Sequence, residues 1–355
     1  MSIIGQAVSV APVRDGHQAG VNSGNVNPLY IEQYGGEVEH RILKDSFMRQ
    51  FFTFKSVRGT DTITNDRIGF TALQKVTRGI RPTDSSPSFD NISVKVDTLV
   101  LARTNQFLLD DFLAHLSVRK EVGMEHGKTI GKFFDEAFII QGIKAAQISN
   151  QDPAGVILGG WPSGSTYARS IRTAPEGFQG ATAVQLAAAN DELDPDKLER
   201  AIQDMCQAIE EKDVDLSGGV VLVRPAQYYV LLRNTKLMDR DFSEMNGDYA
   251  KGKVLMANGV RIQTTNRFPK STDVGVTHFL SNAGNGNAYD VTANDTNCIA
   301  LFLQPKALLA GETIPLTSKV YYSDIELQWF IDSYLAFGVT PNRAEMAAGI
   351  FKYKA

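Results

Sequence analysis

Histidine and cysteine side chains often carry catalytic or metal-binding chemistry, and this sequence holds few of them. The histidines are His17, His40, His115, His126 and His278, and the cysteines are Cys206 and Cys298. A serine or cysteine nucleophile needs a histidine base, but none of these histidines accompanies a GxSxG turn. The cysteines lack CxxC spacing, and His126 has no HExxH pattern around it. We therefore predict that the chain is not an enzyme, that it has no catalytic residue and no metal site, and that the histidines are structural.

Two loops contain residue types that suit phosphate or calcium binding. The stretch VILGGWPSGS, 156–165, is rich in glycine but matches neither GxxxxGK[ST] nor GxGxxG. The stretch DRDFSEMNGD, 239–248, has several carboxylates but misses the calcium-loop pattern. We interpret the first as a surface loop anchored by Trp161 and the second as a solvated or subunit-facing loop. No cofactor is predicted.

The segment RIGFTALQKVTRGIRP, 67–82, is the feature that an ordinary globular fold explains least well. From Arg49 to Arg81 the chain carries seven Lys or Arg residues against Asp61 and Asp66, an excess of five positive charges. Glycines and the stretch TDTITND indicate the turns of a long β-hairpin over 55–88. An isolated two-stranded hairpin is marginal in water, and this one has too few apolar residues for a core of its own.

We therefore predict that this basic hairpin lies on another surface, although a solvated hairpin remains an alternative. The predicted partner is another copy of the chain, because an unpaired strand edge invites pairing with other chains. The cations expected at this contact are Arg58, Arg67, Lys75, Arg78 and Arg81. Carboxylates that could complement them are Glu121, Glu125, Asp135 and Glu136.

The rest of the chain supplies the elements that would position this hairpin. Residues 1–54 indicate an N-terminal arm, and the alternation over 91–104 predicts a strand with one buried face. The longest helical pattern covers 119–149, and Gly123, Gly127 and Gly131 make its first half a predicted hinge. Residues 193–308 alternate helices with strands, which predicts a compact mixed α/β unit.

Composition narrows the function classes further. The 355 residues include 43% hydrophobic and 21% charged side chains, as expected for an ordinary globular protein. The net charge of −4 argues against a chain built to neutralise nucleic-acid phosphates, but not against one that encloses nucleic acid. We expect no membrane span and no secretory signal, and a reducing compartment in which Cys206 and Cys298 form no disulfide framework.

The order of these elements resembles the major capsid proteins of tailed bacteriophages, which share the Hong Kong 97 phage fold. The resemblance is closest to short-tailed podoviruses of the autographivirus type. It rests on YGGEVEHRILKDSF (34–47), DNISVKVDTLVLARTNQFLLDDFLAHLSVRKEV (90–122) and FIDSYLAFGVTPNRAEMAAGIFKYK (330–354). It covers most of the chain after residue 33.

The resemblance implies an α+β capsid fold in five parts. They are an N-terminal arm (1–54), an extended hairpin loop (55–88), a peripheral domain with a spine helix at 119–149 (89–192), an α/β axial domain (193–308) and a return to the peripheral domain (309–355). It also implies hexamers and pentamers in an icosahedral head around double-stranded DNA, without specific DNA binding. A separate scaffolding protein, a portal protein at one vertex and a possible cement protein are the implied partners, with assembly in the bacterial cytoplasm.

Two alternatives remain at this point. An encapsulin-type nanocompartment shares the fold but holds cargo enzymes, so the content of purified particles distinguishes it. An enzyme with an unrecognised site would form a small oligomer with a ligand pocket. The sequence favours the capsid subunit over both.

Overall fold

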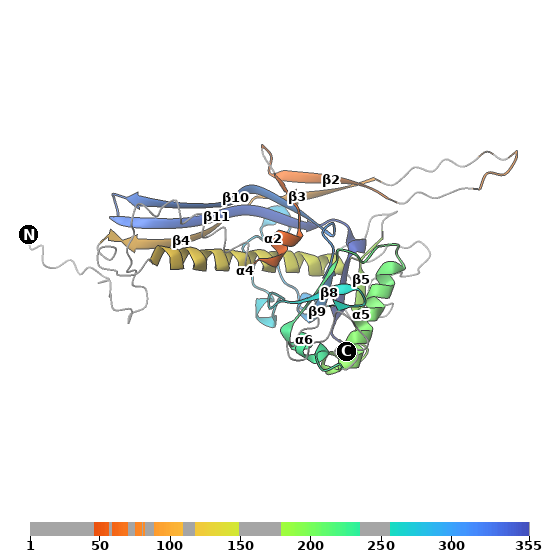
Figure 1. Ribbon diagram of the computed structural model, residues 1–355. Helices are drawn as coiled ribbons and strands as arrows, with labels where there is room; N and C mark the ends of the chain where they lie inside the picture. The colour runs from red at the N-terminus through yellow and green to blue at the C-terminus, as the bar shows by residue number, and fades with distance from the viewer. Residues whose placement is uncertain are drawn as a thin grey trace, which may run out of the picture. The chain divides into compact units, whose positions relative to one another are not determined.

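The chain folds into two compact units, each drawn from several sequence segments (Figure 1). The computed structural model describes residues 46–56, 59–69, 75–79, 81, 89–108, 118–148, 179–234 and 256–354. The first unit comprises Met1–Gln50, Asp97–Asp135 and Glu312–Phe337, and the second comprises Phe51–Val96, Glu136–Gly311 and Gly338–Ala355. Helix α4 (Val118–Ala146) and strands β10 (Leu308–Ser323) and β11 (Gln328–Pro341) each pass from one unit into the other.

In the first unit, β4 (Val100–Phe107) pairs antiparallel with β11. These two strands belong to a four-stranded sheet with the order β1 (Phe54–Ser56), β10, β11, β4, of which β1 falls within the bounds of the second unit. Arg103 and Asp332 stand opposite each other in the β4–β11 register, and two bonds of 2.7 Å join the guanidinium to the carboxylate. Such a bidentate pair fixes the register as well as adding energy.

Helix α2 (Phe47–Phe51) begins at a buried carboxylate of the same unit. Asp135 of α4 accepts from the Ser46 hydroxyl at 2.6 Å and from the backbone N–H groups of Met48 and Phe47 at 3.2 and 3.3 Å. These bonds satisfy donors that a helix N-terminus otherwise leaves unpaired. Asp135 therefore joins α4 to the start of α2.

The second unit is built on a six-stranded sheet. Its order is β5 (Thr182–Gln185), β12 (Ala347–Phe351), β9 (Cys298–Leu303), β6 (Val220–Val223), β8 (Val260–Thr264) and β7 (Met256–Ala257). Helices α5 (Pro195–Glu210) and α6 (Pro225–Leu231) also belong to this unit. Short 3-10 helices cover Asp191–Leu193, Ser271–Asp273, Ala283–Asn285, Asp295–Asn297 and Ala344–Met346.

Local sequence signals explain these elements well. Asp194 caps α5 by accepting from Asp196 N at 3.0 Å, and Pro195 takes the first helical position. The apolar stripe of α5 is buried, with Leu198, Ile202, Met205 and Ile209 at most 3% exposed. Phe302 on β9 fills the core so closely that a Cβ on Gly219 would lie 2.3 Å from its ring. The sheet thus forms a close-packed core.

The hairpin consists of β2 (Thr62–Ile68) and β3 (Phe89–Lys95), which pair antiparallel. This corrects two expectations. The predicted strand 91–104 is two strands, β3 and β4, and the first of them is the second arm of the hairpin. The stretch TDTITND, predicted as turns, contributes most of β2. The alternation of apolar residues runs through both strands, so it did not show the break at 96–99.

The predicted spine helix is confirmed as α4, Val118–Ala146 instead of 119–149. The final strand β12 pairs with β5 and β9 in the second unit. The five-part division, which places 309–355 with the peripheral domain, has boundaries that differ from those of the two units and stays a prediction. None of the helices in the described part of the chain combines the length and apolar composition of a membrane span.

Candidate functional site: the basic hairpin tip

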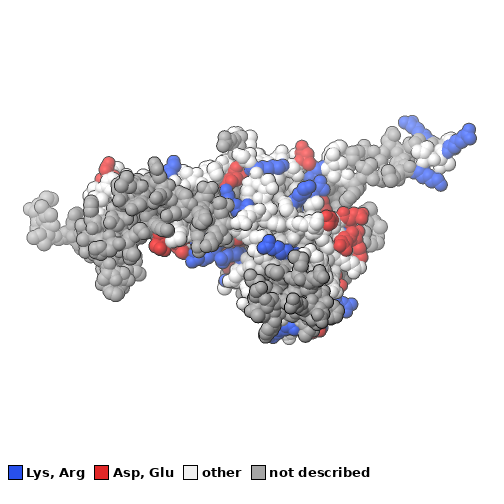
Figure 2. Space-filling model, in the orientation of Figure 1, with Lys and Arg blue, Asp and Glu red and all other residues white. Residues whose placement is uncertain are grey.

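The far end of the hairpin carries a group of exposed cations, which we call the basic tip: Lys75, Arg78 and Arg81. Figure 2 shows Lys and Arg side chains gathered at this end of the hairpin. Gly79, with φ of +88°, forms a turn between two of them. Among the described residues, none pairs with these three cations. Val76 beside them is also exposed, at 69%.

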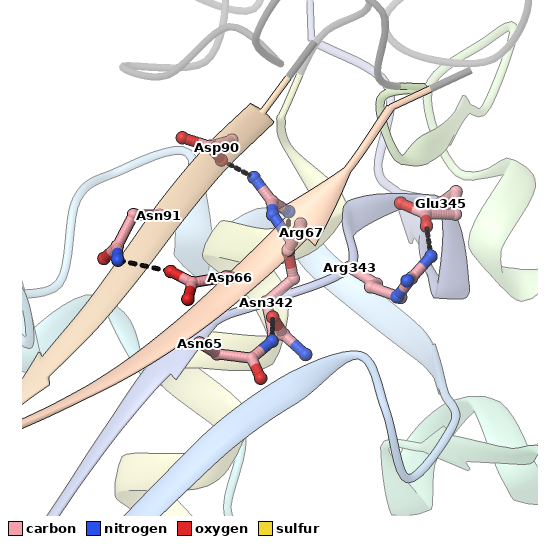
Figure 3. Close-up of polar contacts among 8 residues, drawn as sticks. All are labelled: Asn65, Asp66, Arg67, Asp90, Asn91, Asn342, Arg343 and Glu345. Atoms are coloured by element: carbon pink, nitrogen blue, oxygen red, sulfur yellow. Dashed lines mark hydrogen bonds and ion pairs between the residues drawn. The ribbon is translucent and has the colours of Figure 1, made fainter. Parts of the chain in front are cut away.

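The strand-paired part of the hairpin, which we call its base, is in contrast bonded to another part of the second unit (Figure 3). Arg67 on β2 is 7% exposed and donates to the Asp90 carboxylate and to the Asn342 carbonyl oxygen. Asn65 donates to the Asn342 side chain at 3.0 Å. The hairpin is therefore held on its own chain at one end, and Arg67 belongs to that attachment.

The paired strands of the hairpin also expose apolar side chains. Ile68 and Phe89 are opposite each other in the β2–β3 register and are 62% and 72% exposed. Asp66 and Asn91, the next pair on this face, are joined by a bond of 2.5 Å. An exposed pair of large apolar side chains on the same hairpin as three exposed cations is suited to contact with another protein surface.

The four predicted acidic partners have different surroundings. Glu121 is exposed, and Glu125 is exposed but pairs with Lys128 at 3.4 Å. Asp135 is buried and already accepts three bonds at the start of α2. Burial raises the pKa of Glu136, and the charge of Asp273 raises it further. Of the predicted cations, Arg58 lies outside the described residues. The contact itself stays a prediction for all nine residues.

The structure adds an acidic surface that the sequence analysis missed. We call it the acidic turn: Glu210, Glu211, Asp213 and Asp215, at the end of α5 and in the segment that follows. All four side chains are exposed, and Figure 2 shows Asp and Glu side chains grouped beside this end of α5. The sequence EEKDVD (210–215) contains these four carboxylates, but the lysine among them suggested that their charge was partly neutralised. That lysine is 4% exposed, so it does not neutralise the surface.

The predicted hinge glycines Gly123, Gly127 and Gly131 are all buried in the first half of α4. Their recurrence every four residues places them on one face of the helix. A buried glycine face lets neighbouring groups approach the helix backbone closely. The hinge role stays a prediction.

The histidines within the described residues have structural surroundings. His126 contacts the Thr104 hydroxyl at 2.7 Å, and His278 stacks on Tyr289 with ring centroids 5.6 Å apart. Burial lowers the pKa of both imidazoles. His17, His40 and His115 lie outside the described residues, as do the loops 156–165 and 239–248.

The described residues do not support a reactive cysteine or a metal site. Cys206 and Cys298 are free and buried, and burial raises the pKa of the Cys206 thiol to about 11 and that of Cys298 further. A thiol held neutral in this way is a poor nucleophile. No group of three or more His, Cys, Asp or Glu side chains in this part of the chain could hold a metal ion.

Comparisons with known proteins agree with this architecture. The family model "Gp10A-like: Major capsid protein" matches residues 93–317, which is more than half of the chain. No curated protein matches. Among solved structures, the mature capsid of bacteriophage PhiM1 is 24% identical, with a TM-score of 0.69 over 87% of this chain and 88% of that one.

Two further phage capsids have a similar fold. The capsid of cyanophage P-SCSP1u is 16% identical, with a TM-score of 0.69 over 87% of this chain and 89% of that one. The capsid of Ralstonia phage GP4 is 14% identical, with a TM-score of 0.54 over 86% and 87%. At these identities the structures show the fold alone. Together with the family match, they show that this chain belongs to the Gp10A-like major capsid proteins, has the Hong Kong 97-like fold, and is a structural subunit of the shell of a phage head.

Proposed function

We propose that copies of this chain form the hexamers and pentamers of an icosahedral head, and that the β2–β3 hairpin of each copy lies on a neighbouring copy. The observation that carries this proposal is the contrast along the hairpin. Its base is bonded within the chain through Arg67, whereas the described residues provide no ion-pair partner for Lys75, Arg78 or Arg81 at the tip.

The energetics favour this role in a lattice. An exposed ion pair contributes about 0–1 kcal/mol, so one tip contact binds a neighbour weakly and reversibly. A closed shell repeats the contact at every subunit boundary. The exposed Ile68 and Phe89 would add apolar burial at each of these contacts. Weak single contacts also allow misplaced subunits to dissociate before the shell closes.

The net charge of −4 supports enclosure of double-stranded DNA without specific binding. A basic inner wall would hold phosphates electrostatically, which would hinder packaging. We extend the proposal to a scaffolding protein during assembly in the bacterial cytoplasm, a portal protein at one vertex, a possible cement protein, and a podovirus of the autographivirus type. The sequence resemblance supports these assignments.

Reversing the charge of the tip tests the role of the hairpin. The variant Lys75→Glu, Arg78→Glu, Arg81→Glu should yield folded subunits that do not close, because like charges would meet where the proposal places ion pairs. Negative-stain electron microscopy of the chain expressed with its scaffolding protein gives the readout. Normal shells from this variant would contradict the proposal. Nuclease-protected DNA inside shells from infected cells, in place of protein cargo, would separate a phage head from an encapsulin.

We further propose that the first half of α4 bends during maturation of a precursor shell. Alanine is favoured over glycine in a helix by about 1 kcal/mol per residue, so Gly123→Ala with Gly127→Ala should stiffen this half and slow expansion. Time-resolved light scattering of purified precursor shells would measure the rate. Unchanged expansion kinetics in the double variant would contradict the proposed hinge.

A further inference from the structure

The acidic turn concentrates negative charge on one side of the second unit. Between Glu210 and Asp215 there are four exposed carboxylates and one cation, Lys212. The ammonium of Lys212 is turned inward, where it donates to the Gly180 carbonyl at 3.0 Å and to the Thr182 hydroxyl at 2.7 Å. In the described part of the chain, no ion pair neutralises any of the four carboxylates.

A hollow of about 460 Å³ adjoins the turn and is lined by Asp213, Asp215 and Gln179, among others. The side-chain oxygen of Gln179 is buried there, and the described residues offer it no hydrogen-bond donor. A buried acceptor without a donor costs free energy. The carboxylates of Asp213 and Asp215 and the amide oxygen of Gln179 therefore lie at one hollow. Neither carboxylate has an ion pair among the described residues, although Asp215 accepts from the Ser217 backbone N–H at 3.0 Å and from the Ser217 hydroxyl.

The described cations that line the hollow do not pair with these two carboxylates. Arg343 pairs with Glu345 at 3.2 Å, and Lys212 faces inward as described above. Lys306, which also lines the hollow, is exposed and has no ion pair among the described residues. A guanidinium suits the remaining groups, because its five N–H donors can bond carboxylate and amide oxygens at once.

The matching surface is on the same chain. The basic tip holds two arginines and a lysine, all exposed and without an ion pair among the described residues. We propose that the basic tip of one copy binds the acidic turn of a second copy, with an arginine of the tip entering the hollow beside Gln179. This inference rests on the proposed role of the hairpin between subunits, and it names the surface that the hairpin meets.

A second copy fits these observations better than nucleic acid does. The tip and the turn have opposite charge and occur in equal number, one of each per chain. Two different surfaces that meet head to tail produce a ring when the rotation closes. A tip bound to phosphates would leave the acidic turn without a complementary cationic surface.

A charge swap tests the pairing. The tip variant is Arg78→Glu with Arg81→Glu, and the turn variant is Glu210→Lys with Glu211→Lys. The turn variant places cations at the C-terminal end of α5, where the helix dipole favours them, so folding should be retained. We expect each variant alone to lose closed shells and the combined variant to regain them. The matched control combines the tip variant with Asp324→Lys and Glu326→Lys, two exposed carboxylates between β10 and β11, and should regain none.

The outcomes separate this inference from the proposed function. If the tip variant fails to close and the turn variant neither fails alone nor rescues it, the hairpin acts between subunits but not at the acidic turn, and the inference is overturned. If the tip variant forms normal shells, the proposed role of the hairpin falls as well. If it forms shells that have only lost DNA, the tip binds nucleic acid and the inference is likewise overturned.

Cross-linking gives a second measurement that does not depend on charge reversal. Val76→Cys combined with Glu211→Cys places one thiol on the tip and one on the turn, and the native Cys206 and Cys298 are buried. Mild oxidation of assembled shells should give disulfide-linked multimers on a non-reducing gel. Val76→Cys with Asp324→Cys is the matched control. Equal cross-linking of the two variants would contradict the inference.

Discussion

The six-stranded sheet with α5 and the β2–β3 hairpin belong to one unit but satisfy their side chains in different ways. Around the sheet, apolar residues such as Phe302 are fully buried, and the buried Lys212 ammonium has two acceptors. The hairpin instead exposes Phe89 and the three cations of its tip. The sheet buries its apolar side chains within one chain, whereas the hairpin keeps exposed surface that we propose a neighbouring copy covers. The comparison separates the side chains that folding of the subunit buries from those that we propose assembly buries.

The largest expected effect is in the sheet. Phe302→Ala should lower the free energy of unfolding by about 3–5 kcal/mol, because it leaves a cavity in a packed core. Phe89→Ala makes the same change at a side chain that is 72% exposed and should stay within about 0.5 kcal/mol. Urea unfolding of unassembled subunits, followed by circular dichroism, measures both. Equal losses would mean that the hairpin is part of the subunit core.

A second prediction concerns Lys212, the buried lysine in the turn after α5. Burial lowers the pKa of the Lys212 ammonium from 10.5 to about 8, although the charge of Glu345 opposes the shift. Between these two pH values the unfolded chain binds more protons than the folded one, so stability should rise as pH increases from 8 to 10.5, by at most about 3 kcal/mol.

The variant Lys212→Met should remove this rise, since no proton is then exchanged at this position. Urea unfolding of both chains across pH 7–10.5 gives the comparison. The difference in slope isolates Lys212 from the other groups that titrate at alkaline pH. Parallel slopes would show that Lys212 is not held in a buried environment.

The smallest predicted effect compares the two ends of the hairpin. Arg67→Ala removes the bonds to Asp90 and Asn342 and should cost about 2 kcal/mol of unfolding free energy, as expected for hydrogen bonds to charged groups. Arg78→Ala makes the same substitution at the exposed tip and should change stability by less than about 0.5 kcal/mol. If Arg78→Ala were as costly as Arg67→Ala, the tip would be bonded within its own subunit.

Sequence patterns predicted the sheet better than the hairpin. Signals within a few residues explain the cap at Asp194 and the apolar stripe of α5. They also explain the turn at Asn258-Gly259, where both turn residues have a positive φ. The hairpin was divided at the wrong place because β3 and β4 share one alternating pattern, and only the pairing of β3 with β2 separates them. That pairing is a tertiary contact.

The candidate surfaces also depend on tertiary contacts that the sequence alone does not show. In the sequence Arg67 and Arg78 are equivalent members of a basic segment, and only the fold shows that Arg67 is bonded to Asp90. The acidic turn reads as four carboxylates and a lysine, and its charge becomes clear only when Lys212 is found buried against Thr182. Charge can be counted from sequence, whereas which charges remain free depends on the packing.

The most direct test of the central claim is a cryo-electron microscopy reconstruction of the assembled shell at side-chain resolution. We predict that Lys75, Arg78 and Arg81 of each copy lie within ion-pair distance, about 4 Å between nitrogen and oxygen, of carboxylates on an adjacent copy. A reconstruction in which these side chains contact only their own chain, solvent or packaged DNA would contradict the account.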